Sequence, residues 1–332
     1  MSNPYRIFGV ENSPFSVKVR SYFRYKGLPH EWIVRDSETM AEYQKYAKLP
    51  IVPLLVTPED EAIQDSTPMM ERVEAQHPDP AIHPDGEPSR FLSCLLEEFG
   101  DEWGNKWMLH YRWAREADQV AASTRLVAEM MPTAPESQRA EMAAGIAERM
   151  QGRVWFVGSN EVTAEQIEDS WAEGLDLLQA HLETRPYLFG GRPAFGDFGL
   201  WGQIYNCNLD PTPGQILRDK APAVAAWVAR MLDPKAEGDF ESWDALTATL
   251  SPFIKRMCGD LFLPWSEANS KALAAGDETF DVKLDGRVWT QKPVKYQAKS
   301  LVAIRAKYAA VSDRAELDAV LEATGCLEWL AA

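Results

Sequence analysis

The stretch IVPLLVTPEDEAIQDSTPMM, residues 51–70, places a proline inside an apolar run and a polar Gln-Asp-Ser-Thr sequence ahead of a helix. Residues 51–57 have the length and apolar character of a buried strand, but Pro53 cannot donate to a strand ladder. A short second strand is predicted at 61–64, and a helix is predicted from Pro68, because proline suits a first helical turn. We therefore expect a special backbone arrangement at Pro53.

The residues before this stretch predict the rest of a small α/β domain. Apolar runs and helical stretches alternate, in the order strand 5–10, helix 14–26, strand 30–36 and helix 38–47. Ser13 is the expected N-cap of the first helix, and Gly27 is its expected C-cap. With the strands and helix of the opening stretch, these elements form a predicted domain over residues 1–78.

The pattern changes after a proline-rich linker, predicted at residues 79–89. From 90 to 273, apolar residues recur mostly at helical spacing, which predicts an all-α domain. Thr163 and Gln166 have the spacing of a capping box at the start of one long amphipathic helix.

A C-terminal extension is predicted over residues 274–332. The segment FDVKLDGRVWTQ (280–291) alternates on both sides of Asp285-Gly286, which indicates a hairpin with a type I′ turn. A final helix is predicted from Asp313. Because an isolated hairpin is marginal in water, we expect this one to pack on its own chain, with a partner interface as the alternative.

Charge and cysteine content exclude several classes of partner. The formal net charge is -16, from 50 acidic and 34 basic residues, so the average surface repels nucleic acid and anionic lipid. The four cysteines form no CxxC pair, which argues against a zinc knuckle or a disulfide framework. No apolar run has the length of a membrane span, and no signal peptide is recognised. We expect a soluble, cytoplasmic protein without metal, nucleic-acid partner or membrane contact.

The predicted strands, the turn NSPFS, the strand-embedded VP and the QDS before a helix together resemble the glutathione transferase superfamily, across both domains. The resemblance implies a thioredoxin-like domain that binds glutathione, followed by a helical domain. It also implies a cis bond at Val52-Pro53, with the backbone of Val52 available to the cysteinyl amide of glutathione. An ordinary edge-strand proline is the alternative.

The QDS sequence is similar to the acidic-serine pair of that superfamily, with Asp65 in place of the more common glutamate. The resemblance implies that Ser66 and the helix N-terminus bind the γ-glutamyl carboxylate of glutathione. Asp65 or Gln64 would then accept a hydrogen bond from the α-amino group. Alternatively, Ser66 or Thr67 only caps the helix.

The turn NSPFS has serine where related glutaredoxin-like proteins have C-P-F-C, so disulfide exchange through this turn is excluded. A serine hydroxyl donates well to a thiolate, and the resemblance implies that Ser13 stabilises the thiolate of bound glutathione as the catalytic residue. Phe15 and Ser16 are assigned to the glutathione-binding residues. The alternative is that Ser13 is only the N-cap of the helix.

Two positions depart from the superfamily's pattern. Ile51 stands where many members have a polar residue, so one contact to the glycyl end is expected to be absent. Ala194 replaces the usual Ser or Thr cap three residues before Asp197, which we interpret as a folding residue and not a catalyst.

An aromatic stripe lies along a predicted helix at residues 97–113. Such stripes are usually core, but the resemblance implies that Trp107 and Tyr111 line the electrophile pocket. Glu98 and Glu102 share a face, and without a histidine pair we interpret them as solvated rather than as metal ligands.

The sequence thus predicts a glutathione transferase that joins the glutathione thiolate to a hydrophobic electrophile, with a homodimer as a possible assembly. Two alternatives remain. One is a non-catalytic relative that serves as an interaction or scaffold module, and the other is a glutathione-dependent lyase or isomerase on the same fold.

Overall fold

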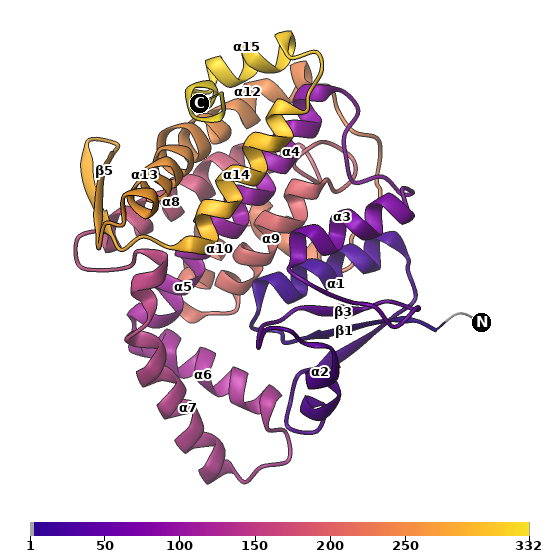
Figure 1. Ribbon diagram of the computed structural model, residues 1–332, viewed down its shortest axis with the longest axis vertical. Helices are drawn as coiled ribbons and strands as arrows, with labels where there is room; N and C mark the ends of the chain where they lie inside the picture. The colour runs from indigo at the N-terminus through magenta and orange to yellow at the C-terminus, as the bar shows by residue number, and fades with distance from the viewer. Residues whose placement is uncertain (1–2, 332) are drawn as a thin grey trace.

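The computed structural model describes residues 3–331, and its N-terminal part is built on a four-stranded sheet (Figure 1). The strand order is β2-β1-β3-β4, with bounds β1 Tyr5–Gly9, β2 His30–Val34, β3 Leu54–Val56 and β4 Ala62–Gln64. β1 pairs in parallel with β2 and antiparallel with β3, so Ile7 lies between Trp32 and Leu55. Ile7 and Leu55 are fully buried, and this face of the sheet joins the main core.

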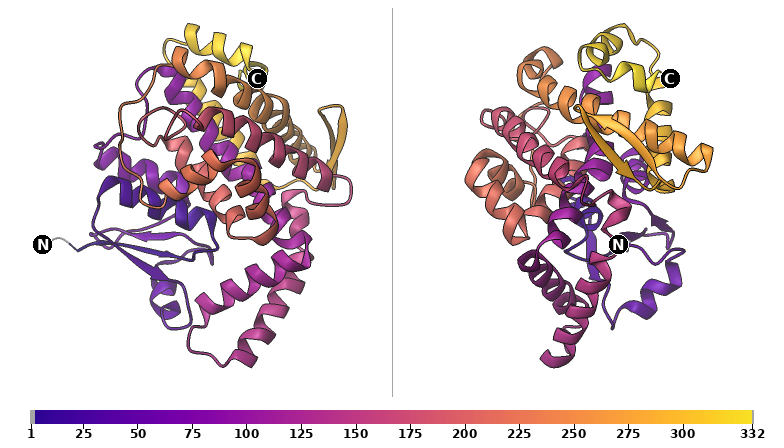
Figure 2. Two further views of the ribbon diagram at one scale, coloured as in Figure 1. Left: turned by 180° about the vertical axis from the view of Figure 1, so that it is seen from behind. Right: turned by 90° about the vertical axis from the view of Figure 1, so that its left-hand side faces the viewer.

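Three helices accompany the sheet: α1 Pro14–Lys26, α2 Met40–Tyr46 and α3 Ser66–Gln76. α1 and α3 lie side by side on one face, and α2 covers the opposite face (Figures 1 and 2). The predicted caps of α1 are confirmed, because Ser13 Oγ accepts the Ser16 N–H and Gly27 adopts φ 62°. The predicted order of strands and helices in this domain is therefore confirmed.

Some predicted boundaries in the opening stretch are wrong. The strand expected at 51–57 is limited to Leu54–Val56, since residues 51–53 leave the sheet and carry a cis Val52-Pro53 bond. The predicted cis bond is confirmed. The helix expected from Pro68 begins at Ser66, where the Met69 N–H already donates to Asp65 O.

The chain is helical from residue 87 to residue 275, apart from short loops, as predicted. The elements are α4 Glu87–Phe99, a π-helical turn η1 Gly100–Gly104, α5 Asn105–Ala114, α6 Glu116–Met130, α7 Glu136–Gln151, a 3-10 turn η2 Val154–Val157, α8 Ala164–Leu182, α9 Phe195–Asn208, α10 Pro211–Lys220, α11 Pro222–Arg230, α12 Trp243–Phe253, a π-helical segment η3 Ile254–Phe262 and α13 Leu263–Ala275. α9 is buried almost all round and packs on α1 and α4. Gly202 permits this approach, since a Cβ there would lie 2.5 Å from Pro14 O.

The predicted capping box at the start of α8 is wrong. Thr163 Oγ1 donates to Gly158 O instead of accepting a helix N–H, and Gln166 Nε2 donates to Val162 O and Val288 O. These side chains bind the preceding loop and the C-terminal hairpin, so tertiary contacts replace the local cap.

The C-terminal extension returns to the body of the molecule. Its elements are β5 Phe280–Leu284, β6 Arg287–Gln291, α14 Lys295–Ala309, α15 Ala315–Ala323 and α16 Leu327–Leu330. The predicted hairpin is confirmed, with Asp285 at φ 49° and Gly286 at φ 77°. The final helix predicted from Asp313 begins two residues later, and α14 was not predicted.

The hairpin packs on its own chain, as expected. Trp289 is fully buried, and its ring lies 5.3 Å from that of Trp103 and shares an acceptor, Gln291 Oε1, with Trp265 of α13. α14 runs along α4 (Figure 1), and Lys307 pairs with Glu71 of α3 at 2.6 Å. The extension thus binds the helical part and the N-terminal part together.

Among residues 3–331, no helix combines the length and apolar character that crossing a membrane requires.

Candidate functional site

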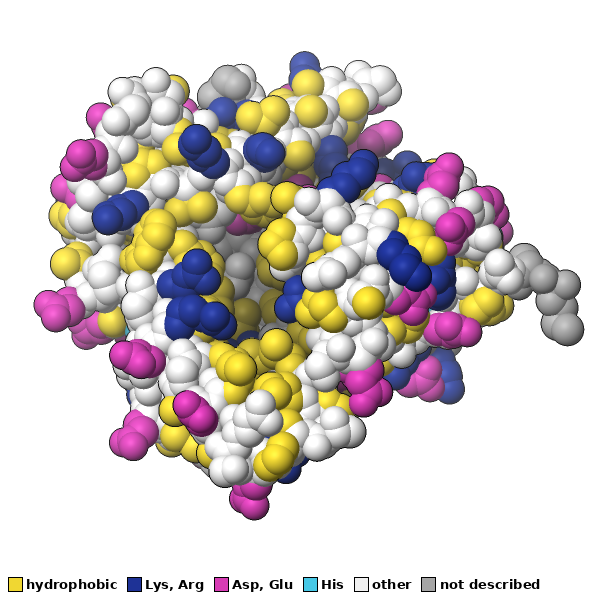
Figure 3. Space-filling model, turned by 60° about the horizontal axis from the view of Figure 1, so that its bottom comes forward, with side chains coloured by type: hydrophobic (Ala, Val, Ile, Leu, Met, Phe, Trp, Pro, Cys, Tyr) yellow, Lys and Arg dark blue, Asp and Glu magenta, His cyan; other side chains and the backbone are white. Residues whose placement is uncertain are grey.

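A cavity of about 510 Å³ lies where the N-terminal part meets the helical part. Figure 3 shows the surface hollowed at this boundary, with basic and hydrophobic side chains on its rim. The lining residues come from seven separate stretches of the chain: Phe15, Arg35, Pro50, Ile51, Val52, Pro53, Asp65, Ser66, Asp101, Glu102, Asn105, Phe156, Val294, Tyr296 and Gln297. It has the size of a small-molecule site.

The N-terminal wall of the cavity contains most of the predicted ligand-binding residues. Val52 and Pro53 lie next to Asp65 and Ser66, because β3 and β4 are adjacent antiparallel strands. Ser66 is 3% exposed and is the first residue of α3, so unpaired N–H groups of the first helical turn face the same region. Asp65 adopts φ 81°, which is uncommon outside glycine.

Gln64, a predicted ligand-binding residue, does not line the cavity. Its Oε1 accepts the backbone N–H groups of Lys48 and Leu49, at 2.9 and 3.0 Å, and its Nε2 donates to Leu49 O and Ile51 O. The side chain therefore fixes the loop that carries Ile51 to Pro53 along the cavity wall, which is a positioning role.

Lys18 of α1 joins the two sides of the site and was not predicted. The fully buried ammonium pairs with Glu97 and with Asp101 Oδ2, at 2.7 Å to the latter, and donates weakly to Ser66 Oγ and Thr67 Oγ1. Burial alone would lower the pKa of Lys18, but the two carboxylates raise it above its ordinary value. Lys18 is charged and holds the start of α3 against η1.

The prediction that Glu98 and Glu102 are solvated is wrong. Both are almost fully buried, because the extension covers this side of α4 and η1, and Ser300 of α14 donates to Glu98. Burial raises the pKa of both groups, to about 8 for Glu102, and neighbouring acids add to the effect. Burial raises the pKa of Asp101 to about 7, although the charge of Lys18 lowers it. The cavity therefore has acidic groups that titrate near neutrality.

The two serines of the NSPFS turn lie outside the cavity lining, beside Phe15, which is part of it. Ser13 Oγ accepts the Ser16 N–H at 3.2 Å, so its own hydroxyl hydrogen is still available for donation. Ser16 is fully buried, and its Oγ has no partner among the described residues. The N-cap alternative for Ser13 is thus observed directly.

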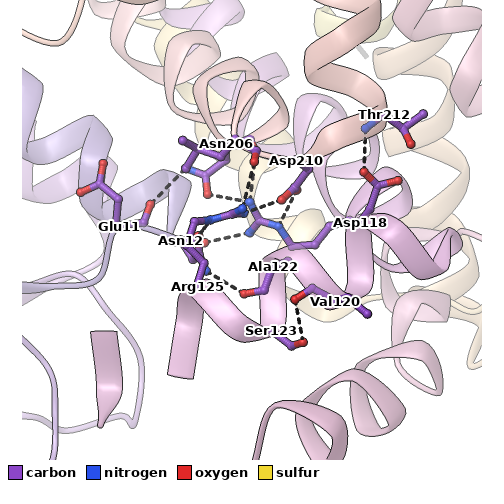
Figure 4. Close-up of polar contacts among 12 residues, drawn as sticks. Glu11, Asn12, Asp118, Val120, Ala122, Ser123, Arg125, Asn206, Asp210 and Thr212 are labelled. Atoms are coloured by element: carbon purple, nitrogen blue, oxygen red, sulfur yellow. Dashed lines mark hydrogen bonds and ion pairs between the residues drawn. The ribbon is translucent and has the colours of Figure 1, made fainter. Parts of the chain in front are cut away.

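A polar network between the domains holds this turn in place (Figure 4). Asn12 Nδ2 donates to Ala122 O, and Asn12 Oδ1 accepts from Arg125 Nε at 2.9 Å. Arg112 of α5 donates to Asn12 O, and both arginines pair with the buried Asp210. The start of α1 is therefore fixed by the helical part.

Trp107 and Tyr111, predicted to line the electrophile pocket, lie in the core instead. Their rings pack on Trp171 of α8 at 5.5 and 6.2 Å, and Trp107 Nε1 donates to Ser170. Both are buried away from the cavity because α8 covers the aromatic face of α5. The common interpretation of an aromatic stripe as core is the right one here.

Asp197 has the folding role that was predicted for it. The fully buried carboxylate accepts the N–H groups of Leu188 and Ala194 and the Nε1–H of Trp227, each at 2.9 Å. Asp197 thus accepts the N–H of Ala194 at the start of α9, although Ala194 has no side-chain acceptor to cap the helix in return.

About half of the cavity lining was not predicted from the sequence: Arg35, Pro50, Asp101, Asn105, Phe156, Val294, Tyr296 and Gln297. Four acidic residues lie among the aromatic residues at 97–103. This pattern could have indicated buried acids, because a helix covered by other segments cannot expose all four side chains to water. The three extension residues gave no local signal. No group of three or more metal-ligating side chains is placed to hold an ion within residues 3–331.

Two family models match the chain. Residues 7–81 match the glutathione S-transferase N-terminal domain, and residues 141–230 match the glutathione S-transferase C-terminal domain. A search of curated proteins found no match.

Many solved structures resemble the chain, at low sequence identity. A glutathione S-transferase from Methylobacterium radiotolerans, in complex with glutathione sulfonate, is 18% identical over 72% of this chain and 97% of that one, with a TM-score of 0.44. The Tau class glutathione S-transferase of mango, Mangifera indica, is 14% identical over 76% and 100%, with a TM-score of 0.42. The β-etherase LigF from Sphingobium is 17% identical over 69% and 95%, with a TM-score of 0.48.

Proposed function

The chain belongs to the glutathione S-transferase superfamily, and on that premise we propose that it binds glutathione in the cavity and conjugates its thiolate to a hydrophobic electrophile. The N-terminal domain would bind the tripeptide, and the helical domain with its extension would complete the site. The proposal includes a reducing, cytoplasmic setting, since all four cysteines are free thiols.

One observation carries the glutathione assignment: Val52, Asp65 and Ser66 line the same cavity. The N-terminus of α3 with the Ser66 hydroxyl suits the γ-glutamyl carboxylate, since free N–H groups and the helix dipole favour an anion there. Asp65 suits the α-ammonium group, and the backbone of Val52 suits the cysteinyl amide. Arg35, which lines the cavity and donates to Pro50 O, offers a cation to the glycyl carboxylate, where Ile51 offers none.

The cysteinyl sulfur would then lie near the N-terminus of α1. Ser13 can donate its hydroxyl hydrogen to a thiolate while its oxygen continues to cap the helix. Such a hydrogen bond and the helix dipole favour the charged form of a thiol. Phe15, Phe156 and Val294 supply apolar surface on which a hydrophobic electrophile would lie against the thiolate.

Replacement of Ser66 by alanine tests the assignment. The affinity for glutathione, measured by titration calorimetry, should fall by about 1–3 kcal/mol, because one charge-assisted hydrogen bond to the carboxylate is lost. Ser137→Ala is the matched control, since Ser137 is an exposed serine in the first turn of α7. It should bind as the wild type does.

Wild-type affinity in Ser66→Ala would refute the placement of the γ-glutamyl end. Binding of glutathione without turnover of aryl halide electrophiles would instead favour the non-catalytic scaffold alternative. Absence of any glutathione binding by the wild-type protein would refute the proposed function as a whole.

A further inference from the structure

Tyr296, in the first turn of α14, donates its hydroxyl hydrogen to Asp65 Oδ2 at 2.8 Å. The two residues are 231 positions apart in sequence, so this contact ties the C-terminal extension to the acid assigned above to the ligand's α-ammonium. Tyr296 lies at the rim of the cavity and is about half exposed. The extension therefore reaches the site itself and does not only support the helices behind it.

Two buried side chains stand next to this contact. Gln297 is 5% exposed and Glu102 is 4% exposed, and both line the cavity. Gln297 Oε1 has no hydrogen-bond partner within the described part of the chain, and Asp101 Oδ1 is likewise unpaired there. Buried acceptors normally have a donor, so this end of the cavity has acceptor capacity for a ligand to satisfy.

Acidic side chains outnumber basic ones around this recess. Asp65, Asp101 and Glu102 are close enough that Asp65 raises the pKa of each of the other two, after the larger effect of burial. Lys18 pairs with Asp101. Lys106 faces Glu102 from α5, but its Nζ lies 3.4 Å from the ring centroid of Trp265 and donates to Val157 O.

Burial lowers the pKa of Lys106 and raises the pKa of Glu102, so it disfavours the charged form of both groups, and a cation bound beside Glu102 would favour its ionised form. A small cation with several hydrogen-bond donors would match the acidic side chains and unpaired acceptors of this recess. An ammonium group has that chemistry, since it carries three donors and no acceptor.

We propose that the extension completes the ligand site: Tyr296 positions the Asp65 carboxylate, and Tyr296, Gln297 and Glu102 together enclose a recess that selects peptides with a free α-ammonium group. This inference rests on the proposed function, because it specifies how one end of glutathione would be recognised. Tyr296 is a positioning residue, since it acts through Asp65.

The geometry gives Tyr296 a specific task. Its hydroxyl engages Oδ2 of Asp65, which leaves Oδ1 free for the ligand. Without that bond the carboxylate can rotate toward solvent, and the recess loses one wall. A purely structural role, in which Tyr296 only anchors α14, would affect all ligands of the cavity equally.

Two ligands separate these roles. S-methylglutathione has the ammonium group and a blocked thiol, and its desamino analogue has hydrogen in place of the ammonium. Titration calorimetry with the full-length wild-type protein should show that S-methylglutathione binds about 10- to 100-fold more tightly than its desamino analogue, the range expected for lost charge-assisted hydrogen bonds. The ratio of these two affinities is the selectivity ratio.

In Tyr296→Phe this selectivity ratio should fall about fivefold or more, through weaker binding of S-methylglutathione alone. Tyr308→Phe is the matched control, because it removes a hydroxyl from the same helix where that group donates to Asp318. Its ratio should equal that of the wild type. Glu102→Gln removes the acid that a bound ammonium would ionise, without changing the size of the recess, so it should also lower the ratio. This variant does not depend on the folding of Tyr296→Phe.

The results that would overturn this inference differ from those that would refute the proposed function. Equal affinity of the wild type for both ligands, or an equal weakening of both in Tyr296→Phe, would overturn this inference while glutathione binding stands. An unchanged ratio in Glu102→Gln would also overturn the recess. Failure of the wild type to bind S-methylglutathione would refute the proposed function instead.

Discussion

At the scale of single residues, the two serines of the NSPFS turn differ in ways that their symmetric spacing hides. Ser13 is the N-cap of α1 and keeps a hydroxyl hydrogen to donate, whereas Ser16 is fully buried inside the first turn. The capping interaction and the proposed thiolate interaction use different atoms of the same hydroxyl group. Ser13 can therefore be both the N-cap of α1 and the proposed donor to the thiolate, so the two interpretations of this serine do not exclude each other.

Substitution of Ser13 separates these two contributions. Ser13→Ala should cost about 1 kcal/mol of stability through the lost cap. It should also raise the pKa of the bound glutathione thiol, because a donor to the thiolate disappears. The thiolate absorbance of the complex, titrated against pH, reports the second effect.

Ser16→Ala is the comparison, and we expect its titration curve to match that of the wild type. If Ser13→Ala also gives the wild-type curve, Ser13 is a helix cap and has no part in stabilising the thiolate.

At the scale of elements, one buried lysine holds three helical segments together. Lys18 of α1 contacts the first residues of α3 through Ser66 and Thr67, and pairs with Glu97 of α4 and Asp101 of η1. The floor of the proposed ligand site is thus fixed by the ionic contacts of a fully buried lysine. Loss of one member of such a group leaves a buried charge without compensation.

Lys18→Met should therefore destabilise the protein by about 3–5 kcal/mol, since two buried carboxylates lose their cation. Urea denaturation followed by circular dichroism measures the free energy of unfolding. Lys45→Met makes the same change at an exposed lysine in α2 and should alter stability by less than about 0.5 kcal/mol. Similar stability of the two variants would contradict the ionic role of Lys18.

At the scale of the whole molecule, the C-terminal extension packs over part of the helical domain. Trp289 of its hairpin packs on Trp103, which also contacts Trp265, while α14 runs along α4 and reaches the cavity with Tyr296. The free energy that keeps this segment in place comes mainly from large buried aromatic side chains. The homodimer remains a prediction, and the hairpin does not depend on a partner to bury its apolar face.

Adjacent residues of β6 give a matched test of this packing. Trp289 is fully buried and Val288 is 52% exposed, because neighbouring side chains of a strand point to opposite faces. Trp289→Ala should lower stability by about 3–5 kcal/mol, and Val288→Ala by less than about 1 kcal/mol. Thermal and urea denaturation of both variants provide the measurement. A small loss in Trp289→Ala would show that the hairpin contributes little to the folded body.

The sequence by itself determined the features that depend on near neighbours. Ser13 and Gly27 bound α1, the Asp285-Gly286 pair forms the hairpin turn, and the Val52-Pro53 bond is cis as the resemblance implied. The caps and the turn depend on preferences of one or two residues, which no distant contact overrides here. The cis bond was implied only by the family resemblance, since an X–Pro bond is locally more stable in trans. The order of elements in the N-terminal domain follows from such signals together with the length of the apolar runs.

Only the tertiary structure decided which groups surround the cavity. The aromatic stripe of α5 could face either a pocket or the core, and α8 buried Trp107 and Tyr111 against Trp171. Glu98 and Glu102 had the spacing of a solvated face, yet the extension covers them. A periodic pattern shows which side chains share a helix face, but it does not show which distant segment packs on that face, because burial depends on contacts across the whole chain.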